Sequence, residues 1–238
     1  MTTGIQREPL TRSAEDYLKA IYHLTDGGRQ AGTNELAQAL DLAPASVSGM
    51  VRRLAEQGLV EHEPYRGVTL AREGRRVALR MLRRHRLIEA YLVAHLGYTW
   101  DTVHEEAERL EHAVSDTLVE RMAQVLGDPR EDPHGDPIPG PDGSLAELVY
   151  VPLTELKVGD EAEIRRVNTS QPDRLRYIGT AGLTPGTRVL VTAREPFQGP
   201  IRLRVGEREQ IIGHELAGML WCGRREKGEG GRGVRSEK

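Results

Sequence analysis

The sequence of 238 residues is poor in cysteine, in aromatic residues and in long apolar runs. Its single cysteine, Cys222, excludes an internal disulfide and is typical of a protein in a reducing compartment. No apolar run approaches the roughly 18 residues of a membrane-spanning helix, and no signal-peptide pattern opens the chain. We therefore expect a cytoplasmic protein without a membrane segment. The length suffices for one large domain or for two to three small ones.

The charges are segregated, although the net charge is only −3. Between residues 100 and 148, thirteen Asp and Glu stand against three Arg, a net charge of −10. Between Arg72 and Arg86 the balance is reversed, with seven Arg and one Glu. The acidic segment should attract cations and the basic one should attract polyanions.

His and Glu side chains recur at helical spacing in two segments. One segment contains His85 and Glu89, and the other contains His104, Glu108, Glu111 and His112. Residues three or four apart share one face of a helix, and the apolar face of the second helix lies directly beside this stripe. Imidazole and carboxylate groups at the edge of a core are suitable ligands for a divalent transition metal. A solvated acidic face is the alternative, but two such stripes favour a metal site.

The segment His104-Glu105-Glu106-Ala107-Glu108 is close to the HExxH motif of zinc proteases. It ends in Glu, so the second imidazole of that motif is missing. The pattern therefore argues against a zinc protease.

The N-terminal third predicts a helix-turn-helix. A first helix should start at Ser13 as N-cap, with an acid three residues later. Thr33 should cap a second helix that ends at Leu40, and Pro44 suits the first turn of a third helix that runs to Gln57. Two short helices joined by a turn of three to four residues form this motif. An ordinary helical hairpin is the alternative.

A β-hairpin over residues 58–70, with its turn at Tyr65-Arg66-Gly67, predicts the wing of a winged helix. The outward positions of the third helix carry small groups and then cations, which suits a helix seated in the major groove against phosphates. The predicted DNA-binding residues are Ala45, Ser46, Ser48, Arg52, Arg53 and, at the tip of the wing, Arg66.

The rest of the chain predicts two long helices and then a β domain, hence an α+β fold. The helices should cover residues 72–96 and 100–126, with apolar faces that suit a subunit interface. A Pro- and Gly-rich linker follows, and from Ala146 the hydrophobic period changes to two, which indicates a small SH3-like β-barrel. The predicted domains are 1–73 (winged helix), 74–145 (metal binding, dimerisation and linker), 146–223 (SH3-like) and 224–238 (disordered tail).

Several ordered motifs resemble those of the diphtheria-toxin-repressor family, which comprises metal-dependent transcriptional repressors of bacteria and archaea. The motifs are residues 13–19 (SAEDYLK), Arg84-His85-Arg86-Leu87, Glu111-His112 and Asp136-Pro137-Ile138-Pro139-Gly140. The resemblance covers nearly the whole chain. It implies a homodimer that has an N-terminal winged helix, a helical dimerisation domain and a C-terminal SH3-like domain, and that binds palindromic operators of metal-transport genes.

The resemblance also implies two sets of metal ligands. The primary site would use Asp16, Glu108, Glu111 and His112, and the ancillary site would use His85, Glu89 and His104. The iron-responsive branch of the family has Met and Cys at the positions of Asp16 and Glu108. Carboxylates at both positions are similar to the manganese-responsive branch, so we expect Mn²⁺ as the activating ion, with Fe²⁺ as the alternative.

Two departures from the family pattern limit what the resemblance implies. The manganese branch has a further acidic ligand where this chain has Lys19, so its two-metal arrangement cannot be copied intact. The acid and the glutamine that the SH3-like domain lends to the ancillary site correspond here to Asn168 and Gln171, which makes that contribution weaker.

Three classes of function follow from the sequence. The first is a metal-activated DNA-binding repressor and not an enzyme. The second is a winged-helix regulator whose C-terminal barrel senses another ligand. The third is a metallohydrolase that uses the His/Glu cluster, against which stands the lack of a Ser, Cys or spare acid placed as nucleophile or base.

Overall fold

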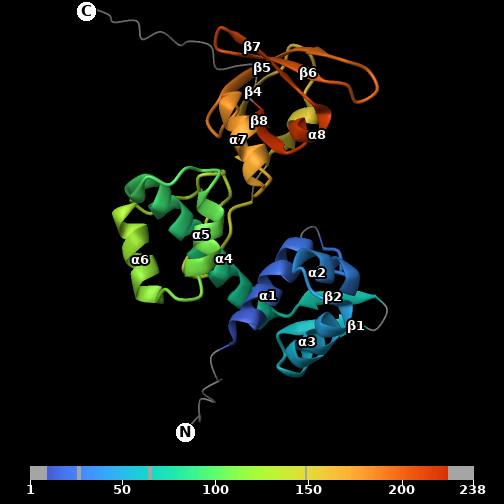
Figure 1. The fold of residues 1–238 in the computed structure, drawn as a ribbon, viewed down its shortest axis with the longest axis vertical. Coiled ribbons are helices and arrows are strands. Elements are labelled where there is room, and N and C mark those ends of the chain that lie inside the picture. The colour runs from blue at the N-terminus through green and yellow to red at the C-terminus, as the bar shows by residue number, and fades with distance from the viewer. Residues whose placement is uncertain (1–9, 26–27, 64–65, 148, 225–238) are drawn as a thin grey trace, which may run out of the picture. The chain divides into compact units, whose positions relative to one another are not determined.

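The computed structural model describes residues 10–25, 28–63, 66–147 and 149–224 (Figure 1). These residues form two compact units. Of the described residues, unit 1 contains 10–25, 28–63, 66–96, 105–130 and 138–146, and unit 2 contains 97–104, 131–137, 147 and 149–224. Among the described residues, no helix is both long and apolar enough to cross a membrane. The predicted disordered tail lies almost wholly outside the described residues, and the predicted domain boundaries stay predictions.

Unit 1 starts with helix α1, Arg12–Leu24. Its N-cap is Thr11 and not Ser13 as predicted, because Thr11 has extended backbone angles and its side chain accepts a hydrogen bond from the backbone N–H of Ala14. The buried face of α1 consists of Ala14, Tyr17, Leu18 and Ile21. The opposite edge of the helix is thereby left to its charged residues.

Helices α2 (Thr33–Ala39) and α3 (Pro44–Glu56) form the predicted helix-turn-helix. The N-cap of α2 is Gly32 and not Thr33, because the Glu35 carboxylate accepts a hydrogen bond from the Gly32 N–H at 2.8 Å and fixes the start one residue earlier. Val47, Val51 and Leu54 of α3 are buried. Its remaining face is exposed, as a recognition helix requires.

Strands β1 (Val60–Glu63) and β2 (Gly67–Leu70) pair antiparallel in the position of the wing. Tyr65 of the expected turn, together with Pro64 before it, lies outside the described residues. Gly74 allows helix α4 to pass directly beside this hairpin, since a Cβ there would lie 1.9 Å from the carbonyl oxygen of Leu59.

Helix α4 spans Arg72–Leu96, as predicted, but the second long helix is interrupted. Its two parts are α5, Val103–Leu110, and α6, Asp116–Val125. The prediction of one helix was wrong because Ser115 starts a new one, accepting a hydrogen bond from the Leu118 N–H at 3.2 Å. Glu111 and His112 therefore lie in the turn after α5.

The segment after α6 is fastened to unit 1 at its end. Ile138 is buried with Leu87, Val119 and Ala123, and its N–H donates to the Arg130 carbonyl at 2.8 Å. Arg83 donates to the Pro139 carbonyl at 2.9 Å and also pairs with Glu120. This part of the predicted linker is therefore well packed.

Unit 2 is built on one antiparallel sheet with the strand order β3-β8-β4-β5-β6-β7. The strands are β3 (Val151–Pro152), β4 (Glu161–Val167), β5 (Arg188–Arg194), β6 (Ile201–Val205), β7 (Arg208–Ile212) and β8 (Leu220–Arg224). The helical elements are η1 (Leu153–Glu155), α7 (Pro172–Thr180) and α8 (His214–Ala217). Within the described residues the sheet is open, because β3 and β7 do not pair with each other as a closed barrel would require.

Two earlier segments of the chain complete unit 2. Trp100 packs against the sheet's hydrophobic core, and Gly179 of α7 lies against its indole ring. The carbonyl of His134 accepts a hydrogen bond from the Val167 N–H at 2.8 Å, and its Nε2 lies 2.7 Å from the Trp100 carbonyl oxygen.

Candidate metal centre

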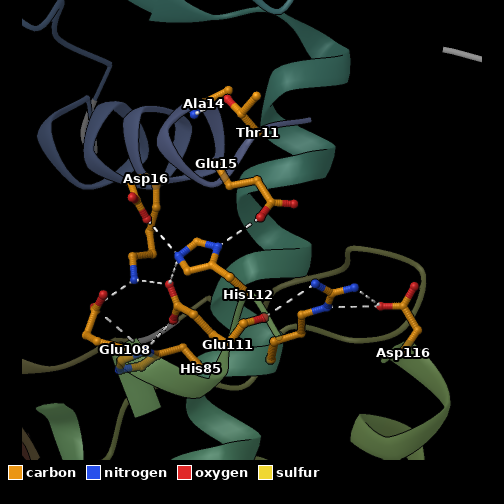
Figure 2. Close-up of polar contacts among 11 residues, drawn as sticks. Thr11, Ala14, Glu15, Asp16, His85, Glu108, Glu111, His112 and Asp116 are labelled. Carbon is orange, nitrogen blue, oxygen red and sulfur yellow. Dashed lines mark hydrogen bonds and ion pairs between the residues drawn. The ribbon is translucent and has the colours of Figure 1, made fainter. Parts of the chain in front are cut away.

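Helix α1 presents three charged side chains to the turn after α5. Glu15, Asp16 and Lys19 occupy neighbouring positions on this helix, away from its buried apolar face. In the turn, the N–H of Glu111 still donates to the Ala107 carbonyl at 2.9 Å, so the helical path extends one residue beyond α5. Side chains from two elements far apart in sequence are thereby brought together (Figure 2).

Asp16, Glu111 and His112 form one cluster of candidate ligands, and His85, His104 and Glu108 form another. Each member of a cluster can offer one ligand atom, and the atoms of either cluster all lie within 4.8 Å of one another. The sequence had placed the first three residues in one primary site. Two carboxylates and one imidazole at this spacing match the requirements of a divalent transition metal.

The imidazole of His112 is oriented by a carboxylate on its far side. Its Nδ1 lies 2.9 Å from Oε2 of Glu15, and since a carboxylate only accepts, Nδ1 donates. A neutral ring then carries its lone pair on Nε2, which faces Asp16 Oδ1 at 2.8 Å and Glu111 Oε1 at 3.4 Å. A carboxylate that fixes the tautomer in this way is the usual companion of a metal-binding histidine.

Nε2 of His112 is buried and has no hydrogen-bond partner among the described residues. Its distance to Asp16 alone would allow a hydrogen bond, but the direction of the contact does not. In that tautomer, lone pairs of nitrogen and oxygen converge on one region, which is favourable when a cation lies between them. The donor set therefore fits a metal ion.

Glu111 is the most deeply buried member of the cluster, with a fully buried side chain. Its Oε2 lies 2.6 Å from Nδ1 of His85, and its Oε1 lies 2.5 Å from Nζ of Lys19. Burial would raise the pKa of the Glu111 carboxyl, but the hydrogen bond from His85 and the charge of Lys19 outweigh it and hold this pKa below its usual value. The group is therefore an anion ready to bind a cation.

Lys19 connects Glu111 to Glu108, whose Oε1 lies 2.7 Å from the same ammonium group. Burial lowers the pKa of Lys19, but the charges of Glu111 and Glu108 outweigh this effect and leave it above its usual value. Burial is the largest influence on the Asp16 carboxyl and raises its pKa. The positive charges of His112 and Lys19 lower this pKa, but they offset the effect of burial only in part.

The predicted ancillary ligands His85 and Glu89 lie one turn apart on α4, both buried, with Nε2 of His85 2.9 Å from Oε1 of Glu89. Burial lowers the pKa of His85, but its hydrogen bonds to Glu111 and Glu89 outweigh that and raise it to about 9. His104 is the second residue of α5, one turn before Glu108. Asn168 and Gln171 belong to unit 2, where Gln171 is the N-cap of α7.

Sequence reasoning missed two members of this cluster. Glu15 was given no role, although an acid next to a candidate ligand on the same helix is a signal that could have drawn attention to it. Lys19 was identified only as a departure from a family pattern. Lys19 contacts Glu108 and Glu111, which follow it in the chain by 89 and 92 positions. Local spacing in the sequence does not reveal contacts over such a separation.

The predicted DNA-binding residues lie on the exposed face of α3 and at the wing. Ala45, Ser46, Ser48, Arg52 and Arg53 are all exposed. The Ser48 hydroxyl donates to the Pro44 carbonyl at 3.0 Å, within the first turn of the helix. Arg66 is also exposed and pairs with Glu63 at 3.1 Å. The guanidinium groups of Arg52 and Arg53 are therefore accessible to a polyanion.

A winged helix beside a cluster of candidate metal ligands is typical of one class of proteins, the metal-responsive transcriptional regulators. Comparison with known protein families identifies the family within this class. Residues 9–68 match the family model "Iron dependent repressor, N-terminal DNA binding domain", and residues 71–140 match "Iron dependent repressor, metal binding and dimerisation domain". Residues 151–223 match the "FeoA domain".

Relatives of known identity cover most of the chain. The iron-dependent repressor IdeR of Mycobacterium leprae is 33% identical in an alignment of 220 positions that covers 87% of this chain and 95% of that protein. The diphtheria toxin repressor of Corynebacterium efficiens is 31% identical in an alignment of 196 positions that covers 76% of this chain and 83% of that protein. A solved manganese-dependent transcriptional repressor in complex with manganese is 41% identical, with a TM-score of 0.83 over 89% of this chain and 100% of that one. The chain belongs to the diphtheria-toxin-repressor family of metal-dependent transcriptional repressors.

Proposed function

We propose that this protein is a manganese-activated homodimeric repressor whose primary metal site consists of Asp16, Glu108, Glu111 and His112. The observation that carries the proposal is the convergence of Asp16 and Glu111 on the bare Nε2 of His112. The site regulates DNA binding and is not catalytic, because the relatives are repressors and each acid of the cluster is already used as a ligand or as its support.

The ligand types favour manganese over iron. Three carboxylates and one imidazole offer hard oxygen donors and no sulfur, whereas thiolate and thioether ligands would favour softer ions. By the Irving–Williams order, zinc can still bind more tightly in the test tube. Selectivity for manganese then comes from a larger coordination number, which bidentate carboxylates supply. Ferrous iron is the alternative activator.

An ancillary position at His85, Glu89 and His104 is part of the proposal. The buried pair of His85 and Glu89 supports it, since an imidazole and a carboxylate one helical turn apart form half of a metal site. Asn168 and Gln171 would add at most neutral oxygen ligands, so we assign them a weaker role.

The proposed operator is a near-palindromic DNA site that controls metal-transport genes, and the protein would act in the cytoplasm. In a homodimer, two copies of α3 would enter major grooves about 34 Å apart, so the symmetry of the DNA would match that of the protein. Small side chains at the start of α3 permit close approach, and Arg52, Arg53 and Arg66 would contact phosphates.

The test is a titration of operator binding with metal. Duplexes selected from a random pool, once with Mn²⁺ and once with Fe²⁺ under anaerobic conditions, would be labelled, and binding followed by fluorescence anisotropy. We expect tight binding with micromolar Mn²⁺, weaker binding with Fe²⁺ and little binding with a chelator. Metal-independent binding would instead favour a winged-helix regulator that senses another ligand. Binding with micromolar Fe²⁺ but not with excess Mn²⁺ would overturn the choice of metal.

A further inference from the structure

Lys19 lies in a position that a metal ion could occupy. Its Nζ is 2.7 Å from Glu108 Oε1 and 2.5 Å from Glu111 Oε1, and its side chain is only 13% exposed. The same two carboxylates flank the imidazole of His85, whose Nδ1 lies 2.6 Å from Glu111 and 3.7 Å from Glu108. Two carboxylates around one cation are ligands that a metal ion could use, but here the cation is the ammonium group of the chain itself.

The ammonium does not fill the primary site. Oε1 of Glu111 is shared, because it contacts Lys19 and also lies 3.4 Å from the bare Nε2 of His112. Asp16, one turn before Lys19 on α1, faces that same Nε2 at 2.8 Å. The Glu111 carboxylate thus contacts the Lys19 ammonium and also lies beside Asp16 and Nε2 of His112, which are the candidate ligands of the primary site.

We propose that the Lys19 ammonium substitutes for a second metal ion, so that the carboxylates of Glu108 and Glu111 join one divalent ion to one lysine instead of bridging two ions. This inference rests on the proposed function, since it concerns how many ions the proposed site holds.

Charge balance supports a single ion at this place. Of the proposed primary ligands, Asp16, Glu108 and Glu111 carry three negative charges, and Lys19 offsets one of them, while the buried ion pair of His85 and Glu89 adds no net charge. The remaining two match one divalent cation. A second divalent ion would lie within a few ångströms of the ammonium, and their repulsion in a partly buried site would be strong.

An ordinary salt-bridge network between α1 and the turn after α5 is the competing interpretation. It predicts that removing Lys19 loosens the site and weakens metal binding. A substitute cation predicts the opposite, because its removal frees two carboxylates and abolishes a repulsion. The two interpretations therefore differ in the sign of one measurable quantity.

The experiment counts bound Mn²⁺ per subunit in the full-length protein by elemental analysis after equilibrium dialysis, with affinity measured by calorimetry. The variants are Lys19→Glu, which adds a carboxylate, and Lys19→Gln, which removes only the charge. Lys157→Glu is the matched control, because Lys157 is exposed in unit 2 and the change in net charge is the same.

We expect Lys19→Glu to bind one more Mn²⁺ per subunit than the wild type, and Lys157→Glu to bind the same number as the wild type. Two ions that share carboxylates about 3.5–4 Å apart would also give an exchange-coupled Mn²⁺ resonance spectrum, absent from the wild type. Lys19→Gln should bind its first Mn²⁺ about ten-fold more tightly, since a nearby like charge is gone.

The outcomes separate this inference from the proposed function. An equal ion count in Lys19→Glu and wild type, or weaker binding by Lys19→Gln, would overturn the role of Lys19 and leave the function intact. A folded wild type that binds no Mn²⁺ would overturn the proposed function itself. Circular dichroism of each variant establishes that the comparison is made between folded proteins.

Discussion

At the scale of single residues, the tautomer of His112 should decide whether the proposed site can hold a metal ion. The Glu15 carboxylate holds the proton on Nδ1 and leaves Nε2 bare. Glu15→Ala should therefore weaken Mn²⁺ binding by about 10- to 100-fold, the usual effect of removing such a partner. Calorimetry measures the change, and Glu61→Ala, at an exposed position of β1, is the control. Unchanged affinity in Glu15→Ala would show that the ring needs no such support.

The choice of metal can be tested at Glu108. Glu108→Cys introduces a soft thiolate, which should shift activation of operator binding from Mn²⁺ towards Fe²⁺ and Zn²⁺. Anisotropy titrations with each ion measure the order of activators. Glu105→Cys places a thiol on the same helix at a side chain that is 71% exposed, and should keep the wild-type order. A wild-type order in Glu108→Cys as well would remove Glu108 from the ligand set.

At the scale of elements, Arg83 fastens the segment around Ile138 to helices α4 and α6. Its guanidinium contacts both carboxylate oxygens of Glu120, at 2.8 and 2.9 Å, and the Pro139 carbonyl at 2.9 Å. Arg83→Ala should lower the free energy of unfolding by about 1–3 kcal/mol, because half-buried acceptors lose their donor. Urea unfolding followed by circular dichroism measures it. Arg76→Ala, which breaks an exposed pair with Glu73, should cost less than about 1 kcal/mol; equal losses would contradict the fastening role.

The DNA-binding elements make a prediction about salt. Arg52→Ala, Arg53→Ala and Arg66→Ala should each weaken binding evenly across sequences and reduce the slope of log affinity against log salt by about one. Anisotropy at several salt concentrations measures that slope. Arg202→Ala, at an exposed position of β6 in unit 2, should leave it unchanged. If Arg66→Ala behaved like this control, the wing would not contact DNA.

The sequence predicted the helices correctly where the hydrophobic period and the helix-breaking residues agreed. The prediction failed where one side chain determines where a helix begins. The bounds of α4 were predicted correctly because a long amphipathic pattern ends at Gly97. The break between α5 and α6 depends on one hydroxyl, that of Ser115, inside a pattern that continues on both sides. In the same way, Asp16, Glu111 and His112 were assigned to one site from motifs, while the contacts of Lys19 needed the folded chain.

At the scale of the whole molecule, the proposed metal site would join the part that matches the family's DNA-binding domain to the part that matches its dimerisation domain. Asp16 lies on α1 and His112 follows α5, so an ion held by both would restrict their relative motion before DNA is bound. Asp16→Ala should keep the dimer in sedimentation experiments but lose the Mn²⁺ dependence of operator binding. Ser13→Ala is the control, because Ser13 is exposed on the same helix and is not its cap. A retained Mn²⁺ response in Asp16→Ala would leave Asp16 without a role in coupling.

The interleaved chain path bears on how such a protein can be assembled by recombination. The stretch that matches the FeoA domain starts at residue 151, yet Trp100 and the segment of His134 complete the same compact unit from far upstream. The Val167 N–H would lose its acceptor if only the matching stretch were moved to another gene. A transfer that kept these contacts would therefore have to carry residues 97–104 and 131–137 along with the sheet.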